Sequence, residues 1–146
     1  FFKQKTAYEM NEVARYYAAS EDVAEFLAHY PERHDFREEA GGNRVFINVW
    51  CWEPAWKIRV TENGRELPVR REQTEDPLYV ISYDIPQSVW KGKYPVDYGK
   101  RGKQHTLFTV DASGPATTLE IEVTDSFGKV YRETMTRPKA FGPQMK

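Results

Sequence analysis

The cysteine and histidine side chains of this sequence, which could bind a metal or act as nucleophile and base, are few and scattered. The 146 residues include one cysteine, Cys51, and three histidines, His29, His34 and His105. A structural zinc site needs closely spaced cysteine and histidine ligands, which this set does not supply. Asp35 follows His34, and such a pair can bind a catalytic metal, but those centres need several more His and Asp ligands. We therefore expect surface or loop-packing histidines, and a small buried Cys51 within a strand.

The carboxylates are numerous enough to consider acid–base chemistry. Glu120 and Glu122 share one face of the apolar alternation in 118–125, and glycoside cleavage needs only two carboxylates. The same alternation is typical of an amphipathic strand whose solvent face carries both residues, and we favour this interpretation. Two other acidic pairs are expected to be solvated loop charge: Glu38-Glu39 and Glu75-Asp76. The sequence contains no phosphate-binding Gly-rich loop, dinucleotide fingerprint or Gly-x-Ser-x-Gly elbow.

A stretch rich in Gly, Lys and Tyr at 87–103 is the best candidate for a contact surface, because long loops in compact domains are often functional. Its aromatic rings could stack on sugars or dock against protein, and its basic residues could meet an acidic partner or a phosphate group. Core packing of the rings and plain solvation of the lysines stay open as alternatives. The candidate contact residues are Trp90, Lys91, Lys93, Tyr94, Tyr98, Lys100 and Arg101, with Lys103 nearby.

The elements that would position these residues are mostly strands. Apolar spacing predicts one short helix over 20–30, with Ser20 as its N-cap and Pro31 as its end, followed by a loop over 31–43. From Arg44 the apolar period is two, and the hairpin signal Asn63-Gly64 follows. The expected strands are 44–52, which should be central and covered on both sides, 56–61, 67–69, 78–85, 104–111, 118–125 and 129–136.

About seven short strands separated by turns favour a mostly β fold. We expect an antiparallel immunoglobulin-like β-sandwich with one short N-terminal helix and with Trp56 as a core anchor. The net charge of −1 and the pI of about 6.4 do not supply the positive field typical of nucleic-acid binding. No apolar run is long enough to cross a membrane. The chain shows no signal peptide, and we interpret it as a segment of a longer protein.

Several short motifs, taken in order, resemble a known family. They are Asn43 to Trp50, Pro54 to Ile58, Glu62-Asn63-Gly64, Asp76-Pro77-Leu78, His105 to Phe108, Val123 to Gly128 and Thr136-Arg137-Pro138. This pattern over about 42–141 resembles the C-terminal domain of bacterial calcineurin-like phosphoesterases, of the three-part type common in Bacteroides-like bacteria. Residues 1–41 match weakly. We expect them to hold the junction with a preceding phosphoesterase domain plus the short helix, and 42–146 to form the accessory domain.

The resemblance implies a modular parent whose preceding domain binds two metal ions, and which is exported to the periplasm or beyond. That domain uses motifs such as Asp-x-His, Gly-Asp-x-x-Asp and Gly-Asn-His, whereas here Gly42-Asn43 is followed by Arg44. We therefore expect no catalytic, cofactor-binding or metal-binding residue in this chain. Its expected partner is the catalytic domain of its own parent. The alternatives are a carbohydrate- or envelope-binding module and, least favoured, an independent enzyme.

Overall fold

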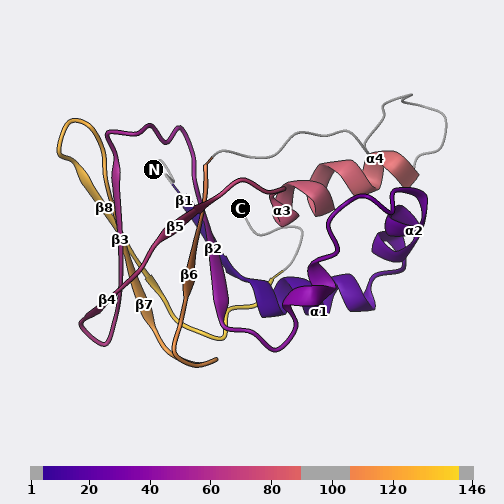
Figure 1. Cartoon of the computed structure of the whole chain (residues 1–146), viewed down its shortest axis with the longest axis horizontal. Helices are drawn as coiled ribbons and strands as arrows, with labels where there is room; N and C mark the ends of the chain where they lie inside the picture. The colour runs from indigo at the N-terminus through magenta and orange to yellow at the C-terminus, as the bar shows by residue number, and fades with distance from the viewer. Residues whose placement is uncertain (1–4, 90–105, 142–146) are drawn as a thin grey trace.

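The chain folds as three layers, two antiparallel sheets and a layer of helices (Figure 1). The computed structural model describes residues 5–89 and 106–141. The first sheet has the order β1-β2-β6-β5, and the second has the order β4-β3-β7-β8. The strands are β1 (Lys5–Glu9), β2 (Arg44–Val49), β3 (Lys57–Glu62), β4 (Arg65–Leu67), β5 (Arg70–Glu72), β6 (Leu107–Asp111), β7 (Leu119–Thr124) and β8 (Val130–Met135). The expected β-sandwich is confirmed.

Strand β2 is central and covered on both sides, as its sequence predicts. It pairs with β1 on one side and with β6 on the other. Val45, Ile47 and Val49 point into the core between the two sheets, while Phe46 points into a second core beneath the helices. Side chains alternate across a strand, so a strand apolar on both faces belongs inside a stack of layers.

The second sheet has one face in the core and one face in solvent. In β7, Leu119, Ile121 and Val123 are buried, and the residues between them are not. The turn between β3 and β4 has positive φ angles at Asn63 (51°) and Gly64 (76°), the conformation that a two-residue hairpin needs. Both features agree with the sequence-based expectation.

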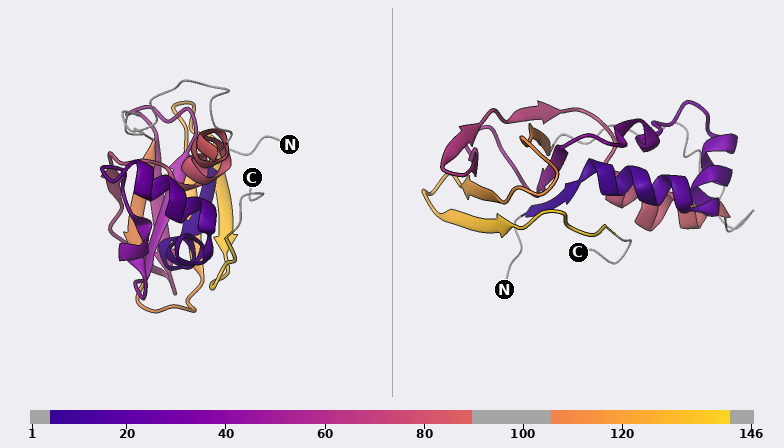
Figure 2. Two further views of the ribbon diagram at one scale, coloured as in Figure 1. Left: turned by 90° about the vertical axis from the view of Figure 1, so that its right-hand side faces the viewer. Right: turned by 90° about the horizontal axis from the view of Figure 1, so that it is seen from below.

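A helical layer covers the outer face of the first sheet (Figure 2). It comprises α1 (Met10–Ala19), α2 (Glu21–His29), the 3-10 turn η1 (Phe36–Glu39), α3 (Pro77–Tyr79), the π-helical turn η2 (Val80–Asp84) and α4 (Ile85–Val89). The predicted helix over 20–30 is α2, and Ser20 caps it by accepting a hydrogen bond from the Val23 N–H at 3.3 Å. The layer is larger than the single helix expected from the sequence, because α1 and the run from Pro77 to Val89 join it.

The strand predicted over 78–85 is wrong, since these residues form α3, η2 and the start of α4. Asp76 accepts a hydrogen bond from the Leu78 N–H at 3.0 Å, and Pro77 takes the first helical position. This Asp-Pro pair is a helix start rather than a strand boundary. A short unbroken apolar run suits a buried strand and a buried helix equally well.

The prediction of Cys51 as a buried strand residue is also wrong. Strand β2 ends at Val49, and Cys51 is exposed in a turn with a φ of 60°. The Trp52 N–H donates to the Val49 carbonyl at 3.3 Å to close this turn. Trp56, which was expected to be a core anchor, is half-buried and packs against the core between the sheets.

Candidate functional site

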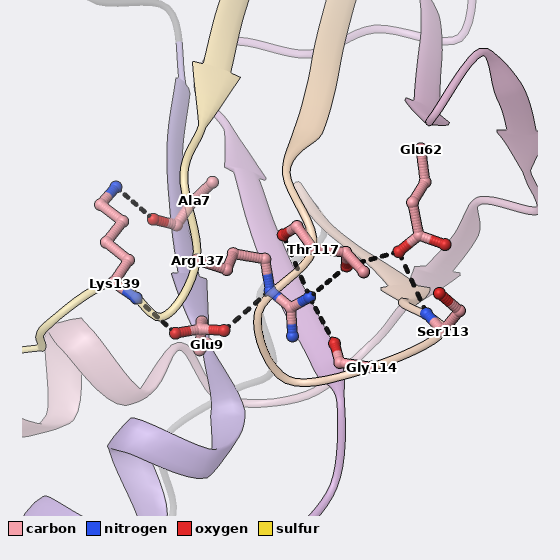
Figure 3. Close-up of polar contacts among 8 residues, drawn as sticks. All are labelled: Ala7, Glu9, Glu62, Ser113, Gly114, Thr117, Arg137 and Lys139. Carbon is pink, nitrogen blue, oxygen red and sulfur yellow. Dashed lines mark hydrogen bonds and ion pairs between the residues drawn. The ribbon is translucent and has the colours of Figure 1, made fainter.

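The densest set of polar contacts lies where the segment after β8 meets the first strand (Figure 3). Arg137 is 4% exposed, and its Nε donates to Glu9 Oε1 at 2.7 Å. Its Nη1 donates to the Gly114 carbonyl at 2.7 Å and to Thr117 Oγ1 at 2.8 Å. One guanidinium therefore joins the end of β1, the loop before β7 and the C-terminal segment.

The segment then continues alongside β1 and α1 (Figure 2). The Lys139 backbone N–H donates to the second carboxylate oxygen of Glu9, and Lys139 Nζ donates to the Ala7 carbonyl at 2.7 Å. The Phe141 ring packs on Tyr8 and Tyr16, with centroid separations of 5.6 and 6.0 Å. We call residues 137–141 the C-terminal strap, because they bind along the outer edge of β1.

Glu62 extends this network into the second sheet. Its Oε2 accepts hydrogen bonds from Thr117 Oγ1 at 2.6 Å and from the Ser113 N–H at 3.1 Å (Figure 3). These bonds, that of Thr117 first, lower the pKa of the Glu62 carboxyl below its ordinary value, because they favour the charged form. Glu62 is thus a buried anion that fastens a loop to a strand.

An open pocket of about 330 Å³ lies beside Arg137. Each charged side chain in its lining is paired with another: Arg137 with Glu9 at 2.7 Å, and Arg15 with Glu12 at 3.5 Å. The full lining is Glu9, Asn11, Glu12, Arg15, Gly42, Pro115, Ala116, Arg137 and Pro138. The pocket is therefore an open crevice over a structural ion pair, and its carboxylates already have partners.

A second polar cluster lies buried between the first sheet and the helices. Asp76 is 7% exposed and accepts hydrogen bonds from the Tyr8 hydroxyl and from Asn48 Nδ2, the latter at 2.7 Å. Asn48 Oδ1 in turn accepts from Thr106 Oγ1 at 2.7 Å. Burial, and then the charge of Asp76, raise the pKa of Tyr8 well above its ordinary value. This phenol stays protonated and acts as a fixed donor.

Arg33 is the centre of a third cluster, within the helical layer. It is 6% exposed, and its Nη2 donates to Asp84 Oδ2 at 2.9 Å while its Nε contacts Glu75. Its guanidinium carbon lies 5.0 Å from the centre of the Phe26 ring. The expectation that Glu75 and Asp76 are solvated loop charge is wrong, because folding brings each of them to a buried donor far away in sequence.

The other candidate catalytic residues have plain structural surroundings. His34 lies edge-on to Phe36 with ring centres 4.5 Å apart, which agrees with a loop-packing role. Glu120 accepts hydrogen bonds from Thr134, and Glu122 pairs with Arg132 at 3.2 Å, on the solvent face of the second sheet. The seven candidate contact residues from Trp90 to Arg101, and also His105, lie outside the described residues. Within 5–89 and 106–141, no three His, Cys, Asp or Glu side chains gather into a possible metal site.

Comparison with known proteins decides the family. The family model for the C terminal of calcineurin-like phosphoesterase matches residues 6–131. The chain belongs to this family. The match confirms the sequence resemblance, and it begins within β1, so it includes the helices that precede β2. No curated protein and no solved structure matches the chain.

Strand β1 and helices α1 and α2 pack with the strands that follow them, because β1 pairs along its whole length with β2. The expectation that residues 1–41 also form a junction with a preceding phosphoesterase domain stays a prediction. None of the helices in the described ranges is long and apolar enough to span a bilayer.

Proposed function

We propose that this chain is a non-catalytic accessory domain that packs on the metal-dependent phosphoesterase domain of its own parent protein. The observation that carries the proposal is that its buried carboxylates all have hydrogen-bond partners within the fold. Glu9, Glu62, Asp76 and Asp84 all accept hydrogen bonds that fasten one segment of the fold to another. A hydrolytic centre needs carboxylates that face substrate or metal, whereas these face arginine, threonine and asparagine side chains. The two metal ions and the hydrolysis would belong to the preceding domain.

The way β1 is held supports a positioning role. A preceding domain would enter this one through β1, which pairs with β2 and bears the C-terminal strap on its other edge. A domain joined through a strand fixed on both sides has less freedom than one joined through a flexible linker. Such a domain could stabilise the phosphoesterase or shape the access to its active site. Export of the parent to the periplasm or beyond is part of this proposal and rests on the family resemblance.

A carbohydrate-binding role has less support from the described aromatic rings. Trp52 and Trp56 are half-buried against the core, and Trp52 packs edge-on to Phe108 with centroids 5.2 Å apart. Half-buried rings offer a sugar less of their surface than fully exposed rings do. The accessory role therefore remains the leading proposal.

Calorimetric titration of the 146-residue chain into the separately produced phosphoesterase region of its parent tests the proposal. We expect saturable one-to-one binding, and a lower melting temperature of the phosphoesterase when this domain is deleted from the full-length protein. The absence of heat together with an unchanged melting temperature would refute the role. A panel of envelope glycans titrated into the same chain would then test the carbohydrate alternative.

A further inference from the structure

One end of the sandwich carries aromatic side chains that the two cores do not use fully. Phe127 is 94% exposed and Trp50 is 37% exposed, while Trp52 and Trp56 are half-buried at the same end. We call Trp50, Trp52, Trp56 and Phe127 the aromatic rim. The residues come from two loops, the connection between β2 and β3 and the turn between β7 and β8, and Figure 1 shows both loops at one end.

The strand register explains why these loops meet. Lys57, the first residue of β3, pairs with Thr124, the last residue of β7. Trp56 therefore precedes β3 at the level where the β7–β8 turn begins. Because that turn contains Phe127, the exposed ring and the half-buried indole lie at the same end of the second sheet.

The turn that presents Phe127 is well ordered. Asp125 Oδ1 accepts hydrogen bonds from the N–H groups of Phe127 and Lys129 at 2.9 and 3.0 Å, and the Asp125 carbonyl accepts from the Gly128 N–H at 3.1 Å. Gly128 has a φ of 86°, which a residue with a side chain rarely adopts. The chain thus holds a large apolar ring outward on a rigid turn, and rigid aromatic anchors are typical of the centres of protein interfaces.

The outer face of the second sheet provides a contrast. It carries ion pairs between Arg59 and Glu66 and between Arg132 and Glu122, each at 3.2 Å. Charges paired in this way suit a surface that stays in water, and desolvating them on docking would cost free energy. Of the three large hydrophobic side chains exposed in the described ranges, Trp50 and Phe127 belong to the rim, and Tyr83 lies in the helical layer.

The aromatic rim also lies where a preceding domain would join. Lys5, at the start of β1, pairs with Val49, the residue immediately before Trp50. A domain tethered at Lys5 would therefore meet the rim at an effective concentration in the millimolar range, as for short linkers generally. Chain entry and exposed aromatic surface coincide at the same end of the sandwich.

We propose that the aromatic rim is the docking surface for the preceding phosphoesterase domain, with Phe127 and Trp50 inserted into apolar hollows of that domain. This inference rests on the proposed accessory function and assigns it a face. The partner is a protein surface of apolar character, and docking would bury rings that solvent reaches in the isolated chain.

Two variants and one control test the affinity of this face. Phe127→Ser and Trp50→Ser should each weaken binding to the separate phosphoesterase region at least tenfold by calorimetry. Tyr83→Ser removes a ring that is 51% exposed in the helical layer and should bind as the parent chain does. Circular dichroism would establish that all three variants keep the fold. If the parent chain binds and both rim variants bind equally well, the rim proposal fails while the accessory function stands.

Cys51 provides a measurement in the intact protein that does not depend on binding between separate pieces. Its thiol is exposed between Trp50 and Trp52, so a small alkylating reagent should label it readily in the 146-residue chain. We expect labelling of the Cys51 peptide, followed by mass spectrometry, to be at least tenfold slower in the full-length protein. Equal rates would overturn the rim proposal. Slower labelling of Cys51 in the full-length protein, even without measurable binding between the separate domains, would support the rim proposal, because the covalent connection between the domains sustains weak docking.

Discussion

The two faces of the first sheet bury side chains of different chemistry. The face toward the second sheet meets a core whose centre is apolar, with members such as Ile47, Val110 and Ile121, and whose buried charges, Glu9, Glu62 and Arg137, lie together at the end beside the strap. The face toward the helices lies against a layer that also buries Asp76 and the Arg33–Asp84 pair. An apolar core accepts any well-packed neighbour, whereas a buried charge accepts only its own partner. The helical side should therefore be the less tolerant of single substitutions.

The largest effect is expected from removing the buried cation of the helical layer. Arg33→Met would leave Asp84, which is fully buried, and Glu75 without their shared guanidinium. Breaking a buried pair in this way typically costs about 3–5 kcal/mol. Chemical denaturation of parent and variant would measure the loss. Arg132→Met, which breaks an exposed pair on the second sheet, is the matched control and should cost about 1 kcal/mol or less. Equal costs for the two variants would show that the buried pair contributes no more to stability than the exposed pair.

Truncating a buried side chain on the apolar face should lower the free energy of unfolding. Ile121→Ala removes three carbon atoms from a side chain that is 1% exposed between the sheets, and such truncations cost about 2–5 kcal/mol. Denaturation at several pH values would measure the loss, which should not depend on pH because no charge is involved. Thr134→Ala, on the solvent face of the same sheet, serves as the control. A cost below about 1 kcal/mol for Ile121→Ala would show that this core is loosely packed.

The buried tyrosines of the helical side should make the free energy of unfolding decrease at high pH. Burial raises the pKa of Tyr17 well above its ordinary value, and the charge of Glu75 raises it further. Above pH 10 the unfolded chain releases this proton while the folded chain keeps it, so the free energy of unfolding decreases as the pH rises. Tyr17→Phe should flatten that decrease, by an amount that approaches about 1.4 kcal/mol per pH unit as the pH rises above 10, as denaturation between pH 9.5 and 11 would show. An unaltered slope in Tyr17→Phe would contradict the assignment.

The smallest effect is expected at the end of the sandwich that lies beside the strap. The hydrogen bonds from Thr117 and Ser113 lower the pKa of Glu62, so its contribution is present above the ordinary pKa of 4.5 and is lost as the pH falls further. Glu62→Gln should therefore make the acid limb of the stability curve shallower, as thermal unfolding between pH 2.5 and 6 would show. Glu120→Gln, an exposed carboxylate on the same sheet, is its control. An unchanged acid limb in Glu62→Gln would mean that the carboxylate contributes nothing to folding.

The same comparison explains how far the sequence could be interpreted. Strands β2, β3 and β6 to β8 follow from apolar alternation, and the hairpin follows from Asn63-Gly64, because both signals are local. The polar pairs of the helical side are not local. Tyr8 meets Asp76 across 68 positions and Arg33 meets Asp84 across 51, and nothing near either residue indicates its partner.

One miss had a local signal that could have prevented it. Asp76-Pro77 is a helix start, and it preceded the run that was interpreted as a strand. Strand β1 was missed as well, and for it the local signal is weak. Ala7 and Tyr8 face different cores, as neighbours in a buried strand do, but β1 passes directly into α1 with no turn residue between them. The sequence correctly placed Glu120 and Glu122 on the solvent face of a strand and His34 in a loop where it packs on a neighbour. It could not reveal the aromatic rim, which depends on the register between β3 and β7.

The C-terminal strap sets an order of events during synthesis. The ribosome makes Glu9 early and Arg137 128 positions later, so the first strand must wait for its charge partner until the last strand is complete. During that interval the outer edge of β1 is unprotected, and open strand edges are where nascent chains associate wrongly. A product that stops short of Arg137 would keep its sheets and its helices but leave Glu9 unpaired. We expect such fragments to be cleared by cellular proteases, so that only a fully translated domain persists.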